Sequence, residues 1–288
     1  DGDVAPFAVV LFLSAALIFW LEPLAARQLL PALGGAPAVW TTCVLFYQLA
    51  LLAGYGLAHG LVRAVPLRAQ VLAFVLLLVV AGLTLPPQAS APDTTTGRLE
   101  LALLAGLGVS LLPAFLVLGM AAPLLQAWLA QSGHADPYRL YAASNAGSLV
   151  GLLAYPLLLE PGLGVARQGR AWSLGFAALA GLSLPCLAAA WRAGGPRLGG
   201  LAPGLRPAAA LRPRWLLLAA VPSSLVLGVT AHVSTDVVAV PLLWVVPMAI
   251  YLASFALAFA PGERLPWRAA SRWLPLAVVT WLISWTME

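Results

Sequence analysis

Long apolar runs, separated by short polar or Pro- and Gly-rich stretches, make up almost the whole chain. A helix that crosses a bilayer needs about 20 mostly apolar residues. Runs that approach or exceed this length lie near 6–30, 38–62, 68–86, 99–130, 138–159, 169–191, 214–231, 237–260 and 272–288. The pattern therefore predicts an all-α fold, a polytopic integral membrane bundle of about nine transmembrane helices.

Prolines interrupt two of these runs. Pro23 follows Glu22 in the first run, so we expect a span to about Trp20 followed by an interfacial turn. The fourth run contains Pro113 and Pro123. These two prolines favour a kinked helix, or a span joined to a short amphipathic piece.

Composition agrees with a bilayer as the solvent. Of the residues, 62% are hydrophobic and 9% are charged, whereas soluble domains carry roughly 25% charged residues. All 15 basic residues are arginines at the ends of apolar runs, so nucleic acid is not an expected partner. Cys43 and Cys186 lie inside apolar runs without Cys-x-x-Cys spacing, so neither a disulfide nor a metal site is expected.

The arginine distribution predicts the orientation in the membrane. The longest loop, 192–214, follows six of the predicted helices and carries Arg192, Arg197, Arg206, Arg212 and Arg214. Because arginine-rich loops stay cytoplasmic, we expect this loop and the N-terminus on the cytoplasmic side. The chain then divides into a six-helix transmembrane block at 1–191, the basic loop at 192–214 and further transmembrane helices at 215–288.

Two pairs of ionisable residues draw attention, one within the first apolar run and one between two later runs. Charge at membrane depth is costly and usually functional. Glu22 and Arg27 are about 140° apart on a helix, so they indicate either a charged site at a helix break or interfacial anchoring. His232 and Asp236 are four residues apart and share one helix face. They indicate a proton relay or cation site, or else a capped helix start. Our hypothesis is that Asp236 faces the interior and pairs with His232 or Arg27.

The segment 138–151 combines small and polar residues. Ser144, Ser148 and Gly151 share a face, a pattern typical of close helix packing. Asn145 offers the alternative of hydrogen bonding to a substrate. Glu160 follows at the helix end, where we expect an exposed terminal carboxylate.

Three long stretches carry a resemblance to a known family. They are EPLAARQLLPALGGAPAVWTTCVLFYQLALLAGYGLAH (22–59), APLLQAWLAQSGHADPYRLYAASNAGSLVGLLAYPLLLEPGLG (122–164) and VPSSLVLGVTAHVSTDVVAVPLLWVVPMAIYLASFALAF (221–259). They resemble the membrane half of bacterial fused major-facilitator/spermidine-synthase-like proteins. The resemblance implies a multi-pass domain of the bacterial inner membrane, followed by a soluble domain similar to aminopropyltransferases.

The resemblance carries over no catalytic residues. The chain contains no strand–Gly-x-Gly–helix unit that would bind the cofactor of an aminopropyltransferase. In the segment GYGLAHGLVRAVPLR (54–68), His59 stands where major-facilitator transporters carry an acidic residue in a Gly-x-x-x-Asp-Arg signature. We therefore expect no catalytic residue, metal or cofactor within this chain.

Three functions remain to be weighed. An anchor or partner-binding subunit of a spermidine-synthase-like membrane protein fits the scarcity of charge within the runs. A transporter of a small molecule such as a polyamine-like cation requires acidic residues along a cavity, for which Glu22, Asp236 and Glu160 are the candidates. An intramembrane enzyme requires a metal or nucleophile constellation, and the sequence shows none. The expected partners are the lipid bilayer and other membrane subunits or a soluble C-terminal domain.

Overall fold

The computed structural model describes residues 4–34, 37–91, 99–131, 138–194, 211–232 and 245–258, with the short stretches 271–273, 275–276 and 279–280. Apart from turns and connecting segments, these residues form only helices. The helices are α1 (Ala5–Leu33), α2 (Pro37–Ala64), α3 (Leu67–Leu83), α4 (Leu99–Gln131), α5 (Tyr138–Ala154), the π-helical turn η2 (Tyr155–Leu159), α6 (Glu160–Gly162), α7 (Val165–Ala193), α8 (Leu211–His232) and α9 (Val245–Ala258). The prediction of an all-helical chain is confirmed for the described part.

Six of the described helices are long and apolar enough to cross a membrane. These candidate spans are Ala5–Leu33, Val39–Ala64, Leu99–Gln131, Leu140–Gly162, Val165–Ala193 and Pro213–Thr230. Leu67–Leu83 and Val245–Phe255 are apolar but shorter. The count of about nine spans and the insertion into a membrane stay predictions.

The prolines do not end the helices that contain them. α1 is one helix through Pro23 and Pro31, so the interfacial turn expected after Trp20 is wrong. α4 likewise continues through Pro113 and Pro123, rather than dividing into a span and a separate piece. A proline removes one backbone hydrogen bond, but a helix that packs among other helices tolerates this loss. α1 is packed in this way, because α2, α4, α5 and α7 all contact it.

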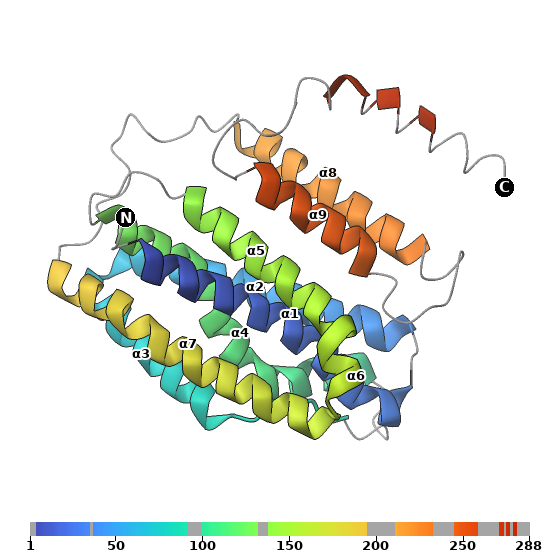
Figure 1. The fold of residues 1–288 in the computed structure, drawn as a ribbon, viewed down its shortest axis with the longest axis horizontal. Helices are drawn as coiled ribbons and strands as arrows, with labels where there is room; N and C mark the ends of the chain where they lie inside the picture. The colour runs from blue at the N-terminus through green and yellow to red at the C-terminus, as the bar shows by residue number, and fades with distance from the viewer. Residues whose placement is uncertain are drawn as a thin grey trace.

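α1 lies at the centre of the described bundle, with α5 along one side and α7 along another (Figure 1). The most extensive helix pairs are α1 with α5 and α2 with α4, while α3 packs against α4 and α7. In each of the two main pairs, a helix with internal prolines crosses a helix with glycines at the contact. At the α2–α4 crossing, a Cβ on Gly54 would lie 3.2 Å from the Cα of Gly119.

The α1–α5 crossing is closer still. A Cβ on Gly151 would lie 2.5 Å from the carbonyl oxygen of Ala16, and a Cβ on Gly147 would overlap the backbone of Phe12. The two backbones therefore touch at these glycines. Such contact increases the dispersion attraction between the two helices.

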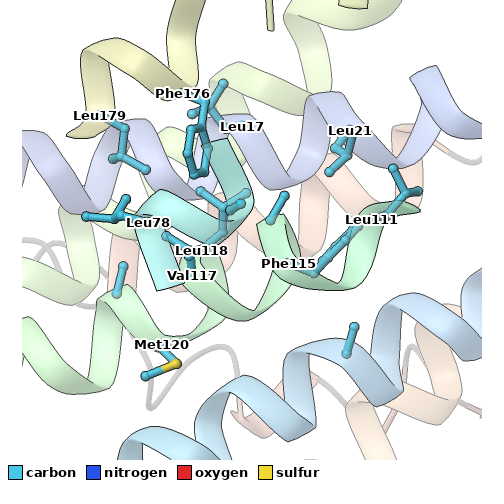
Figure 2. Packing of buried hydrophobic residues seen from close by; sticks show 14 of the residues in the cluster. Leu17, Leu21, Leu78, Leu111, Phe115, Val117, Leu118, Met120, Phe176 and Leu179 are labelled. Carbon is cyan, nitrogen blue, oxygen red and sulfur yellow. The ribbon is translucent and has the colours of Figure 1, made fainter. Parts of the chain in front are cut away.

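Apolar side chains fill the centre of the bundle (Figure 2). Phe176 from α7 lies over Leu17 of α1, and Leu78 of α3 lies beside Leu118 of α4. The buried cluster also includes Leu21, Leu111, Phe115, Val117, Met120 and Leu179. An interior packed in this way resists rearrangement, because adding or removing even one methylene group disturbs the packing of the neighbouring side chains.

α8 and α9 lie at one edge of the bundle, next to α5 (Figure 1). Leu152 of α5 forms a small buried cluster with Val245 and Leu252 of α9, and Phe19 of α1 packs against it. α8 contacts α9, and none of its span Pro213–Thr230 is buried. The edge at α8 is therefore the most open part of the described fold.

Candidate functional site at the α1–α5 end

The described charged residues form one ion pair, between Arg27 of α1 and Glu160 at the start of α6. The Nη1 atom of Arg27 lies 2.9 Å from Oε1 of Glu160, and both side chains are about one-third exposed (36% and 33%). Glu160 is therefore not the freely exposed terminal carboxylate that we expected. The close packing of α1 on α5 brings these two helix ends together.

A π-helical turn positions Glu160. In η2, the N–H of Glu160 donates to the carbonyl of Tyr155, five residues back. Pro156 supplies no N–H within this turn, so a regular α-helical bond to Leu152 is impossible there. Single π turns inside helices occur frequently at functional sites.

Tyr155 is buried beside the ion pair. Its phenol lies close enough to both Arg27 and Glu160 to interact with them electrostatically. Arg27 comes from α1, whereas Tyr155 and Glu160 belong to the continuous segment of η2 and α6. A movement of this segment away from α1 would therefore break the contacts of Arg27 with both. The arrangement fastens helix ends and presents a partly exposed pair of opposite charges.

Two buried side chains of α7 hold this end of the bundle in place. Gln168 donates its amide N–H groups to the carbonyls of Leu159 (3.3 Å) and Leu163 (2.8 Å). The indole N–H of Trp172 donates to the carbonyl of Leu17 in α1 at 2.9 Å. These bonds join α7 to the irregular turn at the end of α5 and to α1.

Gln28, next to Arg27, fastens the segment after α3. Its side-chain oxygen accepts from the N–H of Ala89 at 2.6 Å, and its amide donates to the carbonyl of Pro87 at 3.0 Å. Gln28 was not among the site residues predicted from the sequence. The sequence nevertheless carried a signal, because Gln28 lies in an otherwise apolar run. A buried side-chain amide there needs a hydrogen-bond partner.

Glu22 lies on a different side of α1 from Arg27. Glu22 is half-buried, and its backbone carbonyl accepts a hydrogen bond from the hydroxyl of Tyr47 in α2 at 3.0 Å. Tyr47 stacks on Phe115 with ring centroids 5.3 Å apart. Within the described part of the chain, the Glu22 carboxylate forms no ion pair. Since α1 is unbroken at Pro23, the two charges keep their helical separation and serve different neighbours.

The small-residue segment lies in the α1–α5 contact. Gly151 touches the backbone of α1, Ser148 is buried and Ser144 is half-buried. The amide of Asn145 donates to the carbonyl of Tyr141 at 2.8 Å, one turn back in its own helix. This bond occupies one of the two amide N–H groups of Asn145.

The second predicted pair lies outside the described residues. α8 ends at His232, whose side chain is not described, and Asp236 falls in the segment 233–244. The hypothesis that Asp236 pairs with His232 or Arg27 stays a prediction. Arg27 has a described partner in Glu160.

A buried hydrogen bond between α3 and α4 also escaped the sequence analysis. The indole N–H of Trp128 donates to Oε1 of Gln70 at 2.9 Å, and the Gln70 amide donates to the carbonyl of Val65 at 3.1 Å. Gln70 and Trp128 are both almost fully buried. Their role is to join α3 to α4.

Comparison of the chain with known protein families, with curated proteins and with solved structures finds no match. Among the described residues, no group of three or more His, Cys, Asp or Glu side chains is placed to hold a metal ion.

Proposed function

We propose that the chain is an integral membrane domain of the bacterial inner membrane that acts as an anchor or partner-binding subunit. The observation that carries the proposal is the filled apolar centre of the helix bundle. Most of the residues at this centre come from α1, α2, α3, α4 and α7, and they form one contiguous buried cluster. The association with a spermidine-synthase-like, aminopropyltransferase-like protein rests on the resemblance of segments 22–59, 122–164 and 221–259.

Two features favour a rigid platform over a bundle that opens and closes. The α1–α5 and α2–α4 crossings are backbone contacts at Gly151 and Gly54, which allow little sliding. The described ion pair, Arg27 with Glu160, fastens the end of α5 to α1. A platform of this kind holds a partner at the membrane without moving a solute through its own centre.

Membrane anchoring is tested by fractionation. The chain is fused to a soluble fluorescent protein and expressed in bacteria, and the membranes are washed with alkaline carbonate. We expect the fusion to stay in the membrane pellet, because six apolar helices in the described part of the chain are each long enough to span. Release of the fusion by carbonate, or its recovery in the soluble fraction, would contradict the proposal.

A transporter of a polyamine-like cation is the alternative, and the half-buried Glu22 favours it. Glu22 lies beside Tyr47 and has no described ion-pair partner. A carboxylate beside aromatic rings is a suitable environment for an organic ammonium group.

Uptake into proteoliposomes separates the two functions. The purified chain is reconstituted, and entry of labelled putrescine or spermidine is compared with entry into protein-free vesicles. The anchor proposal predicts no difference. Uptake that is lost in Glu22→Gln but kept in Glu100→Gln, a change at an exposed glutamate at the start of α4, would establish transport instead.

A further inference from the structure

An arginine is held in a fixed position where α3 begins and α7 ends. The guanidinium of Arg68 lies over the ring of Trp191, 5.6 Å from its centroid, and its Nε–H donates to the Trp191 carbonyl at 3.5 Å. Gly194, with φ of 27°, closes around the same group. A Cβ at Gly194 would lie 3.0 Å from both Nε and Nη2 of Arg68. The guanidinium is therefore oriented by its surroundings while Arg68 and Trp191 remain exposed.

The surroundings of Arg68 are positively charged. Arg63 at the end of α2 and Arg192 next to Trp191 are both exposed, and Arg63 is 3.4 Å from the ring nitrogen of His59. α2, α3 and α7 contain no acidic residue. Within the described part of the chain, no carboxylate pairs with these arginines. An arginine fork in such a place is suited to the oxygens of a phosphate group.

From Arg68 towards the C-terminal end of α3, exposed leucines form an apolar track. Leu72 and Leu76 follow Arg68 at intervals of four residues on α3, so they share its face. Leu184 is exposed on α7 two turns before Trp191. α3 and α7 pack side by side at the edge of the bundle (Figure 1). The edge thus presents a phosphate-binding group at its end and hydrocarbon along its length.

We propose that this α3–α7 edge binds one anionic phospholipid, with its phosphate on Arg68 and an acyl chain along Leu72, Leu76 and Leu184. The leucine track favours a lipid over a soluble phosphate compound, because only a lipid covers both parts of the edge. Trp191 fits the headgroup level, where tryptophans of membrane proteins concentrate. Arg63 and Arg192 add long-range attraction for a negative headgroup. The inference rests on the proposed membrane location and names one partner at a defined place.

Lipid titration of the purified chain in detergent tests the proposal. Native mass spectrometry measures binding of phosphatidylglycerol and phosphatidylcholine to the unchanged chain, to Arg68→Ala and to the matched control Arg167→Ala. Arg167 is an exposed arginine at the opposite end of α7. We expect the unchanged chain and the control to prefer phosphatidylglycerol. Arg68→Ala should weaken that binding about tenfold, as expected for loss of one charge-assisted hydrogen bond to phosphate.

Two more variants keep the result interpretable. Arg68→Lys retains the charge but loses the fork, and Trp191→Leu removes the stacking ring but keeps every arginine. Both should show a reduced preference for phosphatidylglycerol while circular dichroism shows unchanged helix content. Equal binding of the two lipids by the unchanged chain, or the same loss in Arg167→Ala as in Arg68→Ala, would overturn the proposal.

A competition experiment with glycerol 3-phosphate tests whether the site binds a soluble phosphate compound. If it competes with phosphatidylglycerol at equal concentration, the site takes a free phosphate compound and the lipid assignment is wrong. Failure of this inference is also separable from failure of membrane anchoring. Loss of lipid preference with the chain still in the carbonate-washed pellet rejects the lipid site alone, whereas release by carbonate rejects the anchor.

Discussion

The α1–α5 crossing gives the sharpest prediction for stability. Replacing Gly151 with alanine adds one Cβ, which would lie 2.5 Å from the carbonyl oxygen and 2.8 Å from the Cα of Ala16. These are backbone atoms, so no side chain can rotate away to make room. The substitution therefore requires α5 to move away from α1.

The size of the effect follows from this distance. Ordinary contact begins near 3.4 Å, so the helices have to separate locally by roughly 1 Å, enough to forfeit a quarter to a half of the dispersion energy at each affected contact. Insertion of a methyl group into a packed interface typically costs about 1–3 kcal/mol. The helix propensity of alanine offsets about 1 kcal/mol of this cost. With a shift of roughly 2–4 °C for each remaining kcal/mol, Gly151→Ala should lower the Tm by a few degrees. Gly147→Ala should lower it further, because its Cβ would overlap the backbone of Phe12.

The assay is thermal unfolding of the purified chain in detergent, followed by intrinsic fluorescence. Gly181→Ala is the matched control, since Gly181 lies within α7 and a Cβ there would meet no atom within 4 Å. Alanine favours a helix over glycine by about 1 kcal/mol, so the control should melt at the same temperature or higher. Gly151→Ala melting together with Gly181→Ala would refute the inference that close backbone contact holds α5 on α1.

Three further predictions concern topology, the ion pair and the buried polar contact. Gly200→Cys on a cysteine-free background should resist labelling by an impermeant reagent added from outside, because the arginine-rich loop is expected in the cytoplasm; labelling from outside would reverse the predicted orientation. A double-mutant cycle of Arg27→Ala and Glu160→Ala, measured by thermal unfolding, should give a coupling free energy of about 0.2–1 kcal/mol, since both side chains are one-third exposed. A coupling free energy indistinguishable from zero would show that the ion pair does not stabilise the contact between the two helices. Trp128→Phe should lower the free energy of unfolding by about 1–3 kcal/mol, because the buried oxygen of Gln70 loses its donor. Adding Gln70→Leu should recover part of this loss. If the second substitution recovers none of it, the loss in Trp128→Phe comes from packing and not from the hydrogen bond.

Helix positions were largely predictable from the sequence. The apolar runs at 38–62 and 99–130 correspond to α2 at 37–64 and α4 at 99–131. A run of apolar residues is a local property, and at membrane depth an isolated backbone segment satisfies its hydrogen bonds only as a helix. The continuity of α1 through Pro23 was not predictable in this way. It depends on which helices surround α1, and the residues near Pro23 do not specify those neighbours.

The partners of polar side chains were decided by the tertiary structure. Arg27 and Glu160 are far apart in the chain, and they meet because Gly147 and Gly151 allow α5 to approach α1. Gln28 likewise meets its hydrogen-bond partner in the segment after α3 only in the folded bundle. A polar residue in an apolar run predicts that a partner exists, but its identity requires knowledge of which helices are neighbours.

Neighbouring helices are hard to deduce because lipid and protein interior are equally apolar. In α3, Leu76 is 63% exposed and Leu78 is 8% exposed, although both are leucines in the same run. A soluble helix marks its buried face with an apolar stripe, whereas a helix that is apolar all round carries no such mark. The sequence by itself therefore determined that the chain folds into apolar helices and where most of them lie. Which face of each helix is buried, and which polar groups consequently meet, was decided only by the packing of the bundle.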